Sequence, residues 1–161
     1  MAENNQTNAN KQLVLQKIYI KDLSFESPRA PAIFSSNVSP QTRLNIKSSA
    51  NKVADDTQEV VLTLTVEAIH EDKTLFMVEI EQAGLFQIQG YTNEELQMLV
   101  GSYCPGTLYP FAREAISDVI THGGFPQLLL QPINFDALYA QAVKDQGDGN
   151  RERAQGSPST H

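Results

Sequence analysis

The clearest structural signal in this chain is the stretch TQEVVLTLTVEAIHEDKTLFMVEIEQ, residues 57–82, in which two alternating segments flank one short polar turn. Along residues 57–70, apolar side chains occupy every second position, and glutamate and threonine fill positions between them. This alternation is typical of an antiparallel strand with one buried face and one face in water. Residues 74–82 alternate in the same way after the turn, so the stretch predicts a β-hairpin.

Two further extended segments precede the hairpin. Residues 42–47 alternate between apolar and polar side chains, and residues 13–26 form a longer, less regular segment. Pro28, Pro31 and Pro40 lie between them, and proline breaks a strand because it cannot donate to the hydrogen-bond ladder. We therefore expect a sheet of four antiparallel strands.

The second half of the chain has helical spacing. Thr92 and Glu95 match a capping box, and apolar residues follow them at intervals of three and four. Pro105 and Gly106 are expected to end this helix. Pro110 is expected to begin the next one, because proline has no N–H to lose in a first helical turn.

Two more signals complete the helical half. Gly123 is placed to stop the second helix, and Asn134 can cap a last one. Strands that are followed by helices, and do not alternate with them, predict an α+β fold. We expect the C-terminal helices to pack on one face of the sheet.

Both ends of the chain are polar. Residues 1–11 are rich in Asn and Gln, and residues 146–161 are rich in polar residues, Gly and Ser. Neither end has enough apolar surface to offset the entropy of ordering, so both are expected to be disordered tails. The predicted folded body is residues 12–145.

Charge and hydropathy exclude several classes of partner. The chain carries 12 basic and 19 acidic side chains, for a net charge of −7. This balance argues against nucleic acid and against an anionic membrane surface. No apolar run approaches the roughly 18 residues of a membrane helix, and the first residues lack the apolar core of a signal peptide. We expect a cytoplasmic protein without direct membrane insertion.

The residues that carry catalysis or bind metals are sparse. Cys104 is the only cysteine, and His70, His122 and His161 are far apart. None of them forms a metal-ligand pattern or a nucleophile with an adjacent base, and no glycine-rich phosphate loop is present. We therefore expect no enzyme activity, no metal site and no cofactor.

Alternation does suggest one binding surface. Asp22 and Glu26 point the same way if residues 22–26 are extended, and Met77 and Glu79 share one face of the hairpin. Carboxylates around one apolar contact suit a basic protein partner. The same alternation also fits an ordinary solvated sheet face, and from alternation alone that plainer interpretation is favoured.

Four segments together resemble the SecB family of bacterial export chaperones. They are IYIKDLSFESPRAP (18–31), EVVLTLTVEA (59–68), EIEQAGLFQIQG (79–90) and LVGSYCPGTLYPFAREAISDVITHGGFPQLLLQPINFDALY (99–139). The resemblance covers about residues 12–145. It implies a four-stranded antiparallel sheet with helices, and a homotetramer built as a dimer of dimers. It also implies a chaperone that binds unfolded precursor proteins without ATP and delivers them to the SecA motor.

The resemblance further implies roles for individual residues. The SecA-binding face of the family matches Asp22, Glu26, Met77 and Glu79, with Met77 where members often have Leu. The contact between dimers matches Val78, Ile80 and Gln82, with Val78 where some relatives have Cys. The client-binding groove matches Phe34, Val38, Leu44, Ile46, Leu138, Tyr139 and Val143. Some relatives carry Trp at the position of Val38, whereas this chain has no Trp.

Two points about partners accompany this resemblance. SecA in this family carries a small basic, zinc-binding C-terminal segment, so any zinc would belong to that partner. An alternative role on the same fold is a solitary SecB-like chaperone with one dedicated client, such as an antitoxin. The acidic SecA-type face favours general export.

Overall fold

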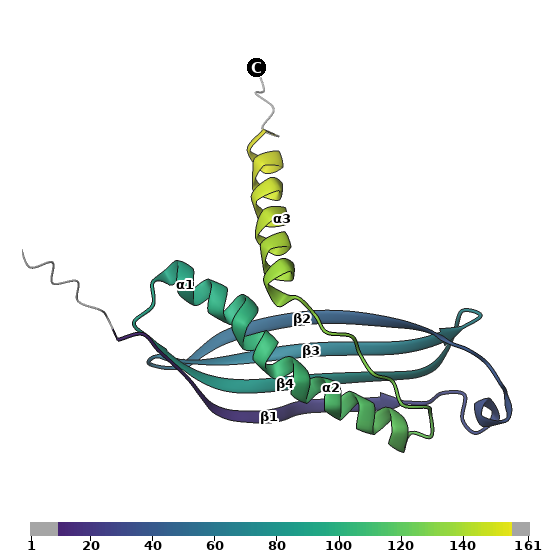
Figure 1. Ribbon diagram of the computed structural model, residues 1–161. Coiled ribbons are helices and arrows are strands. Elements are labelled where there is room, and N and C mark those ends of the chain that lie inside the picture. The colour runs from purple at the N-terminus through teal and green to yellow at the C-terminus, as the bar shows by residue number, and fades with distance from the viewer. Residues whose placement is uncertain (1–9, 156–161) are drawn as a thin grey trace, which may run out of the picture.

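Four antiparallel strands form one sheet in the computed structural model, which describes residues 10–155 and the side chains as far as residue 149. The strands are β1 (Gln12–Glu26), β2 (Gln41–Ala54), β3 (Thr57–His70) and β4 (Lys73–Gln89), with a short 3₁₀ helix η1 (Ala32–Ser35) between β1 and β2. Their order is β1-β4-β3-β2, so the hairpin lies in the centre and β1 and β2 are the edges (Figure 1). The expected four-stranded antiparallel sheet is confirmed.

The predicted alternation is confirmed by burial. The apolar side chains of β3 on the inner face are completely buried: Val60, Leu62, Leu64, Val66 and Ala68. β4 continues past residue 82, where alternation was expected to end, because Phe86 and Ile88 extend the buried face. Gly84 allows a helix to approach closely here, since a Cβ at this position would lie 3.0 Å from the Leu108 side chain.

The helical half begins as predicted. Thr92 caps α1 (Asn93–Met98): the Glu95 N–H donates to Thr92 Oγ1 at 3.2 Å, and the Thr92 N–H donates to the Glu95 carboxylate at 3.0 Å. These reciprocal bonds are the expected capping box, which satisfies N–H groups that have no partner inside the helix.

The predicted break at Pro105 and Gly106 and the new start at Pro110 are wrong. After α1, a π-helical turn η2 (Leu99–Tyr103) leads directly into α2 (Cys104–His122), and Pro110 lies inside α2. The wider π turn changes the hydrogen-bond pattern just before Pro105, so its missing N–H is tolerated. Packing of α2 on the sheet outweighs the roughly 3 kcal/mol that an internal proline costs.

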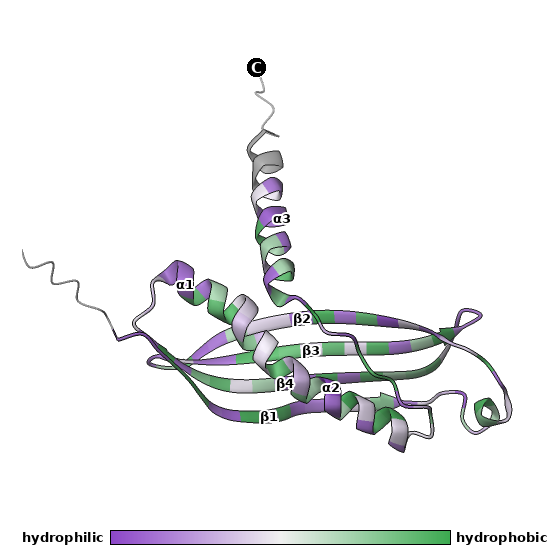
Figure 2. Ribbon diagram, viewed as in Figure 1, coloured by the Kyte–Doolittle hydropathy of each residue, from purple (hydrophilic) through white to green (hydrophobic). Residues whose placement is uncertain are grey.

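α2 covers the two central strands. Leu108, Ala112, Ile116 and Ile120, which recur every four residues, are fully buried against β3 and β4. Figure 2 shows hydrophobic residues recurring along the strands and along α2. Burial of one such large side chain contributes about 1.5–3 kcal/mol, so this layer fixes the helix on one face of the sheet.

The last helix stands away from the sheet. α2 ends at His122, Gly123 is its C-cap as predicted, and an extended connection leads to α3 (Phe135–Gln155). Asn134 caps α3 as predicted, because its Oδ1 accepts the Ala137 N–H at 3.0 Å. α3 continues beyond residue 145, so the first part of the expected C-terminal tail is helical. Residues 1–9 and 156–161, which hold the rest of both expected tails, lie outside the described residues.

Candidate functional site: an acidic sheet face and an apolar groove

The strand register brings the predicted SecA-binding residues onto one face. We call the face of the sheet opposite α2 the open face. The pairs between β1 and β4 on this face are Glu26 with Met77, Ser24 with Glu79, and Asp22 with Glu81. Side chains that are directly opposite on antiparallel strands share a face, with Cβ atoms about 4.5–5.5 Å apart. Two acidic positions on β1 therefore flank an apolar and acidic strip on β4.

The register also adds acidic residues that the resemblance did not supply. Across β3, Glu67 lies opposite Met77, and Thr65 lies opposite Glu79. Glu81 shares the face of Glu79, as the alternation of the hairpin already indicated. Glu67 could be placed beside Met77 only by the pairing of β3 with β4, which alternation within one strand does not determine.

The open face changes sign across the sheet. On the edge strand β2, Arg43 lies opposite Glu67, and Lys47 lies opposite Thr63. The acidic part therefore covers β4, β3 and the last residues of β1 near the hairpin turn. Basic residues follow β2, and Lys17 and Lys21 lie further along β1. A basic partner is attracted to the β1–β4 side and repelled from the β2 edge, which favours one position on the face.

Two glutamates of the open face are held by neutral groups. Thr65 Oγ1 donates to Glu79 Oε2 at 2.9 Å, and Thr74 Oγ1 donates to Glu67 Oε1 at 2.6 Å. A hydroxyl donor orients a carboxylate without cancelling its charge. Neither hydrogen bond therefore removes negative charge from the open face.

Glu59, further along β3, contrasts with them. Lys21 Nζ donates to Glu59 Oε1 at 2.8 Å, and the Tyr19 hydroxyl donates to the other carboxylate oxygen. These two donors, Lys21 first, lower the pKa of the Glu59 carboxyl. Burial, with the bond to Glu59, raises the pKa of Tyr19 to about 12. The lysine neutralises this carboxylate, so Glu59 links β3 to β1 across β4 and adds little negative charge.

The residues predicted to join the dimers face the other way. Val78 and Ile80 are fully buried and Gln82 is 3% exposed within this one subunit, on the face that α2 covers. Fully buried side chains cannot touch a second subunit, so a role of Val78 and Ile80 in assembly would act through α2. Gln82 borders a hollow of about 370 Å³ beside Ile20 and Phe111, which are 49% and 48% exposed.

The predicted groove residues fall in three places. Phe34 and Val38 line an apolar groove of about 430 Å³ at the hairpin end of the sheet, together with Phe76, Phe125 and Leu128. The Phe125 ring centroid lies 4.7 Å from that of Phe76 and 5.4 Å from that of Phe34. Phe34 is 52% exposed, so this aromatic cluster opens to solvent.

Leu44 and Ile46 continue from this groove along β2. They lie opposite Val66 and Leu64, on the face that α2 covers. Leu44 is exposed and Ile46 packs partly against the core. Thr42 lines the groove, whereas Leu44 and Ile46 do not; they follow Thr42 on the same face of β2.

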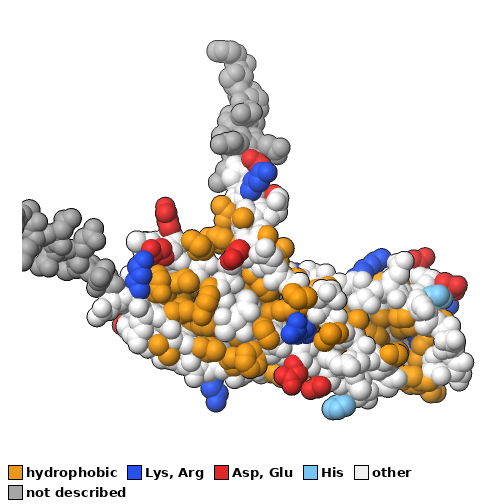
Figure 3. Space-filling model, viewed as in Figure 1, with side chains coloured by type: hydrophobic (Ala, Val, Ile, Leu, Met, Phe, Trp, Pro, Cys, Tyr) orange, Lys and Arg blue, Asp and Glu red, His pale blue; other side chains and the backbone are white. Residues whose placement is uncertain are grey.

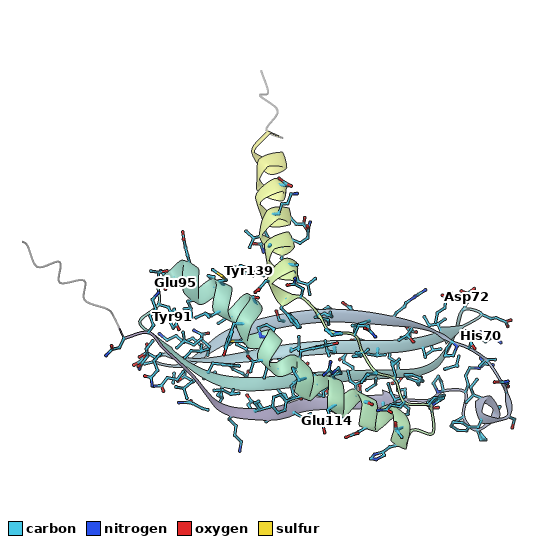
Figure 4. The ribbon with its side chains drawn as sticks, viewed as in Figure 1. His70, Asp72, Tyr91, Glu95, Glu114 and Tyr139 are labelled. Carbon is cyan, nitrogen blue, oxygen red and sulfur yellow. The ribbon has the colours of Figure 1, made fainter. Side chains whose placement is uncertain are left out.

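Leu138, Tyr139 and Val143 lie on α3 and do not line the groove. Tyr139 packs on Gly101 of the π turn, and Figure 4 shows it at the base of α3. The Ser102 hydroxyl donates to the Asp136 carboxylate beside it. Leu138 and Val143 are exposed, and Figure 3 shows other hydrophobic side chains spread over the face that carries the helices.

The chain matches known proteins over most of its length. The family model described as "Preprotein translocase subunit SecB" matches residues 6–146. The chain belongs to the SecB family. It is 48% identical over 146 residues to the protein-export protein SecB of Hahella chejuensis, covering 91% of this chain and 92% of that protein. It is 52% identical over 132 residues to the protein-export protein SecB of Nitrosococcus oceani, covering 81% of this chain and 80% of that protein.

A solved structure supports the SecB fold. The SecB-like chaperone of Mycobacterium tuberculosis, in complex with a peptide from an antitoxin, matches with a TM-score of 0.63 and 18% identity. The match covers 75% of this chain and 90% of that chain. The α+β arrangement of a four-stranded antiparallel sheet with C-terminal helices is therefore that of a SecB-like chaperone.

The described residues of this SecB-family chain include its one cysteine and a histidine at the hairpin turn. Cys104 is buried, and burial raises its pKa to about 12, so the thiol stays protonated at neutral pH. His70 lies at the hairpin turn with Asp72 (Figure 4). Among the described residues, no group of three His, Cys, Asp or Glu side chains gathers to hold a metal. Within the same residues, no helix is long and apolar enough to cross a membrane.

Proposed function

We propose that this chain is an ATP-independent chaperone that binds unfolded precursor proteins, keeps them translocation-competent and delivers them to SecA for export. The observation that carries this proposal is the separation of two surfaces on opposite faces of one sheet. The acidic open face and the apolar groove do not overlap, so a client and SecA can be bound at the same time. A carrier that hands over its client needs this arrangement.

The groove supports the client-binding role. Phe34 and Val38 offer aromatic and aliphatic surface at the hairpin end, and Leu44 and Ile46 extend it along β2. Unfolded chains expose apolar side chains that such a surface binds, whereas folded proteins bury them. Leu138, Tyr139 and Val143 would add contacts from α3.

The open face supports the SecA-binding role. Asp22, Glu26 and Glu79 surround Met77, and a basic SecA segment is complementary to this set. Such charge complementarity raises association rates and sets orientation more than it raises affinity. The contact is therefore expected to be reversible and sensitive to salt, as delivery requires.

Assembly as a dimer of dimers is part of the proposal. Ile20 and Phe111 leave apolar surface exposed beside Gln82, in a hollow that Glu114 and Asp118 also line, and a second subunit would cover this surface. Val78 and Ile80 would support this contact from beneath α2. Several grooves on one tetramer would bind one long client with higher avidity than one groove.

Titration calorimetry without nucleotide tests the proposal. One secretory precursor is titrated in its unfolded and folded forms, and SecA is then titrated into the client complex. Binding of the unfolded form alone, followed by SecA binding to the loaded chaperone, is expected. Binding of neither form would overturn the proposal.

The names of the curated relatives favour general export over a chaperone with one dedicated client. A pull-down from cytoplasm tests this choice, because precursors are bound there before export. Many precursors are expected in the bound fraction. One dominant protein would favour the dedicated-client alternative, and SecA would then not bind the open face.

A further inference from the structure

We propose that Thr65 is a positioning residue for Glu79 on the open face, so that the carboxylate is already oriented when the basic segment of SecA binds. This inference rests on the proposed function. Thr65 would not contact the partner itself, and its effect would pass through the Glu79 carboxylate.

The two side chains meet across the central pair of strands. Thr65 on β3 and Glu79 on β4 are directly opposite in the register, and Thr65 Oγ1 donates to Glu79 Oε2 at 2.9 Å. The backbone beneath Thr65 is fixed, because Leu64 and Val66 on either side are fully buried. A β-branched side chain is also restricted about its first torsion angle. The donor therefore has a defined position.

The bond leaves Glu79 both charged and able to accept further bonds. Thr65 occupies one bond to Oε2, so the Oε1 atom is available to a partner. The hydroxyl is neutral and leaves the full negative charge, unlike Lys21, which pairs with Glu59 on the same sheet. Fixing a flexible side chain before binding removes part of the entropy cost at the interface.

The neighbouring row of the sheet provides a matched control. Thr63 lies opposite Glu81 on the same two strands and the same face. Within the described part of the chain, Thr63 makes no side-chain hydrogen bond. Replacing either threonine with valine keeps the shape and the preference for strands, but only Thr65→Val removes a bond to a carboxylate.

A double-mutant cycle with full-length SecA tests the proposal. SecA affinity is measured by calorimetry for the wild type, Thr65→Val, Thr65→Ser, Glu79→Gln, the Thr65→Val/Glu79→Gln double variant, and Thr63→Val. Thr65→Val is expected to weaken binding by about three- to tenfold, the effect of mobilising one side chain. Thr65→Ser is expected to restore it, and Thr63→Val to leave it unchanged. Unfolding midpoints and client affinity are measured on every variant.

The outcomes separate this inference from the proposed function. Thr65→Val is expected to have no further effect when Glu79 is already glutamine. If Glu79→Gln weakens binding but Thr65→Val does not, or if Thr65→Val acts equally in both backgrounds, the positioning role is overturned. If Glu79→Gln itself leaves SecA affinity unchanged, the proposed docking face fails and the positioning role with it.

Discussion

The ring of Tyr139 on α3 lies directly against Gly101 in the π-helical turn, so that a Cβ at Gly101 would come within 2.6 Å of it. This contact joins the base of α3 to the helical layer on the sheet. Phe135 supports the same junction through an edge contact with Tyr109, whose ring centroid lies 5.7 Å away. The position of α3 therefore depends on one residue without a side chain.

Gly101→Ala is expected to displace Tyr139 and loosen α3. Alanine has a higher helix propensity than glycine, so a loss of stability in this variant would come from the clash with Tyr139. We expect a cost of about 1–3 kcal/mol, typical of overpacking, and faster amide exchange in α3. Gly106→Ala is the control, because its Cβ would meet Phe135 at an ordinary 3.7 Å. Equal stability and exchange in both variants would contradict the role of Gly101.

Charge reversal on the open face is expected to weaken SecA binding. Asp22→Lys and Glu79→Lys each replace attraction for a basic segment with repulsion, and we expect at least a tenfold loss of affinity, about 1.4 kcal/mol. Client affinity should stay near that of the wild type, because the groove lies on the opposite face. Glu94→Lys on α1 changes the net charge equally, away from this face. A similar loss with Glu94→Lys would show that only net charge matters.

Val78→Asp is expected to destabilise the subunit as well as any assembly. The Val78 side chain is fully buried beneath α2, so an aspartate there would be unpaired and removed from water. We expect a loss of at least about 3 kcal/mol in the free energy of unfolding, measured by urea denaturation. Light scattering should show a lower average mass for the same variant, because its subunits associate more weakly. A dimer of unchanged subunit stability would place Val78 at a direct contact.

Phe34→Ala is expected to weaken the binding of unfolded clients. Phe34 is the exposed member of the aromatic cluster, so its loss removes apolar contact surface while the core remains. An anchoring aromatic side chain typically contributes about 1–2 kcal/mol to binding. We therefore expect Kd, measured by calorimetry, to increase about five- to thirtyfold. Val53→Ala is the control, because Val53 is equally exposed at the far end of β2. Similar losses in both variants would argue against a defined groove.

Burial of Tyr19, together with its bond to Glu59, predicts a dependence of stability on alkaline pH. The pKa of Tyr19 is raised from 10.0 to about 12, so between these values the unfolded chain loses this proton while the folded protein keeps it. The contribution of Tyr19 is therefore complete below pH 10 and is lost as the pH rises toward 12. Tyr19→Phe should reduce this decline, measured as the difference in unfolding free energy between wild type and variant. Parallel curves would contradict the raised pKa.

Glu59 acts at the other end of the pH scale. Its pKa is lowered, mainly by Lys21, so its contribution is present above the ordinary value of 4.5 and is lost as the pH falls below that. Lys21→Met should reduce the loss of unfolding free energy at acid pH. Lys17→Met should not, because Lys17 lies on the same strand but makes no such bond among the described residues.

Several elements were predictable because their signals are local. Alternation along residues 57–70 has the period of a strand, and it placed Val60 and Leu64 in the core and Thr65 on the opposite face. The capping box at Thr92 and the cap at Asn134 depend on residues within one turn, so both were confirmed.

Pro110 shows where a local signal was overruled. Proline favours a first helical turn, yet here it lies within α2, because the apolar stripe on either side of it buries one continuous helix against β3 and β4. A local preference of about 3 kcal/mol lost to the burial of several large side chains. The local sequence around Pro110 does not show which of these two free energies is larger.

Alternation along the chain was enough to predict which side chains share a face within each strand, since the period of two is a property of the extended backbone. The folded sheet showed that β1 pairs with β4 and β2 pairs with β3, and it fixed the register of every pair. It placed Glu67 beside Met77, set Thr65 against Glu79, and buried Val78 beneath α2. The first two relationships depend on the register of the hairpin, which alternation within one strand leaves open, and the third depends on the packing of the sheet against α2.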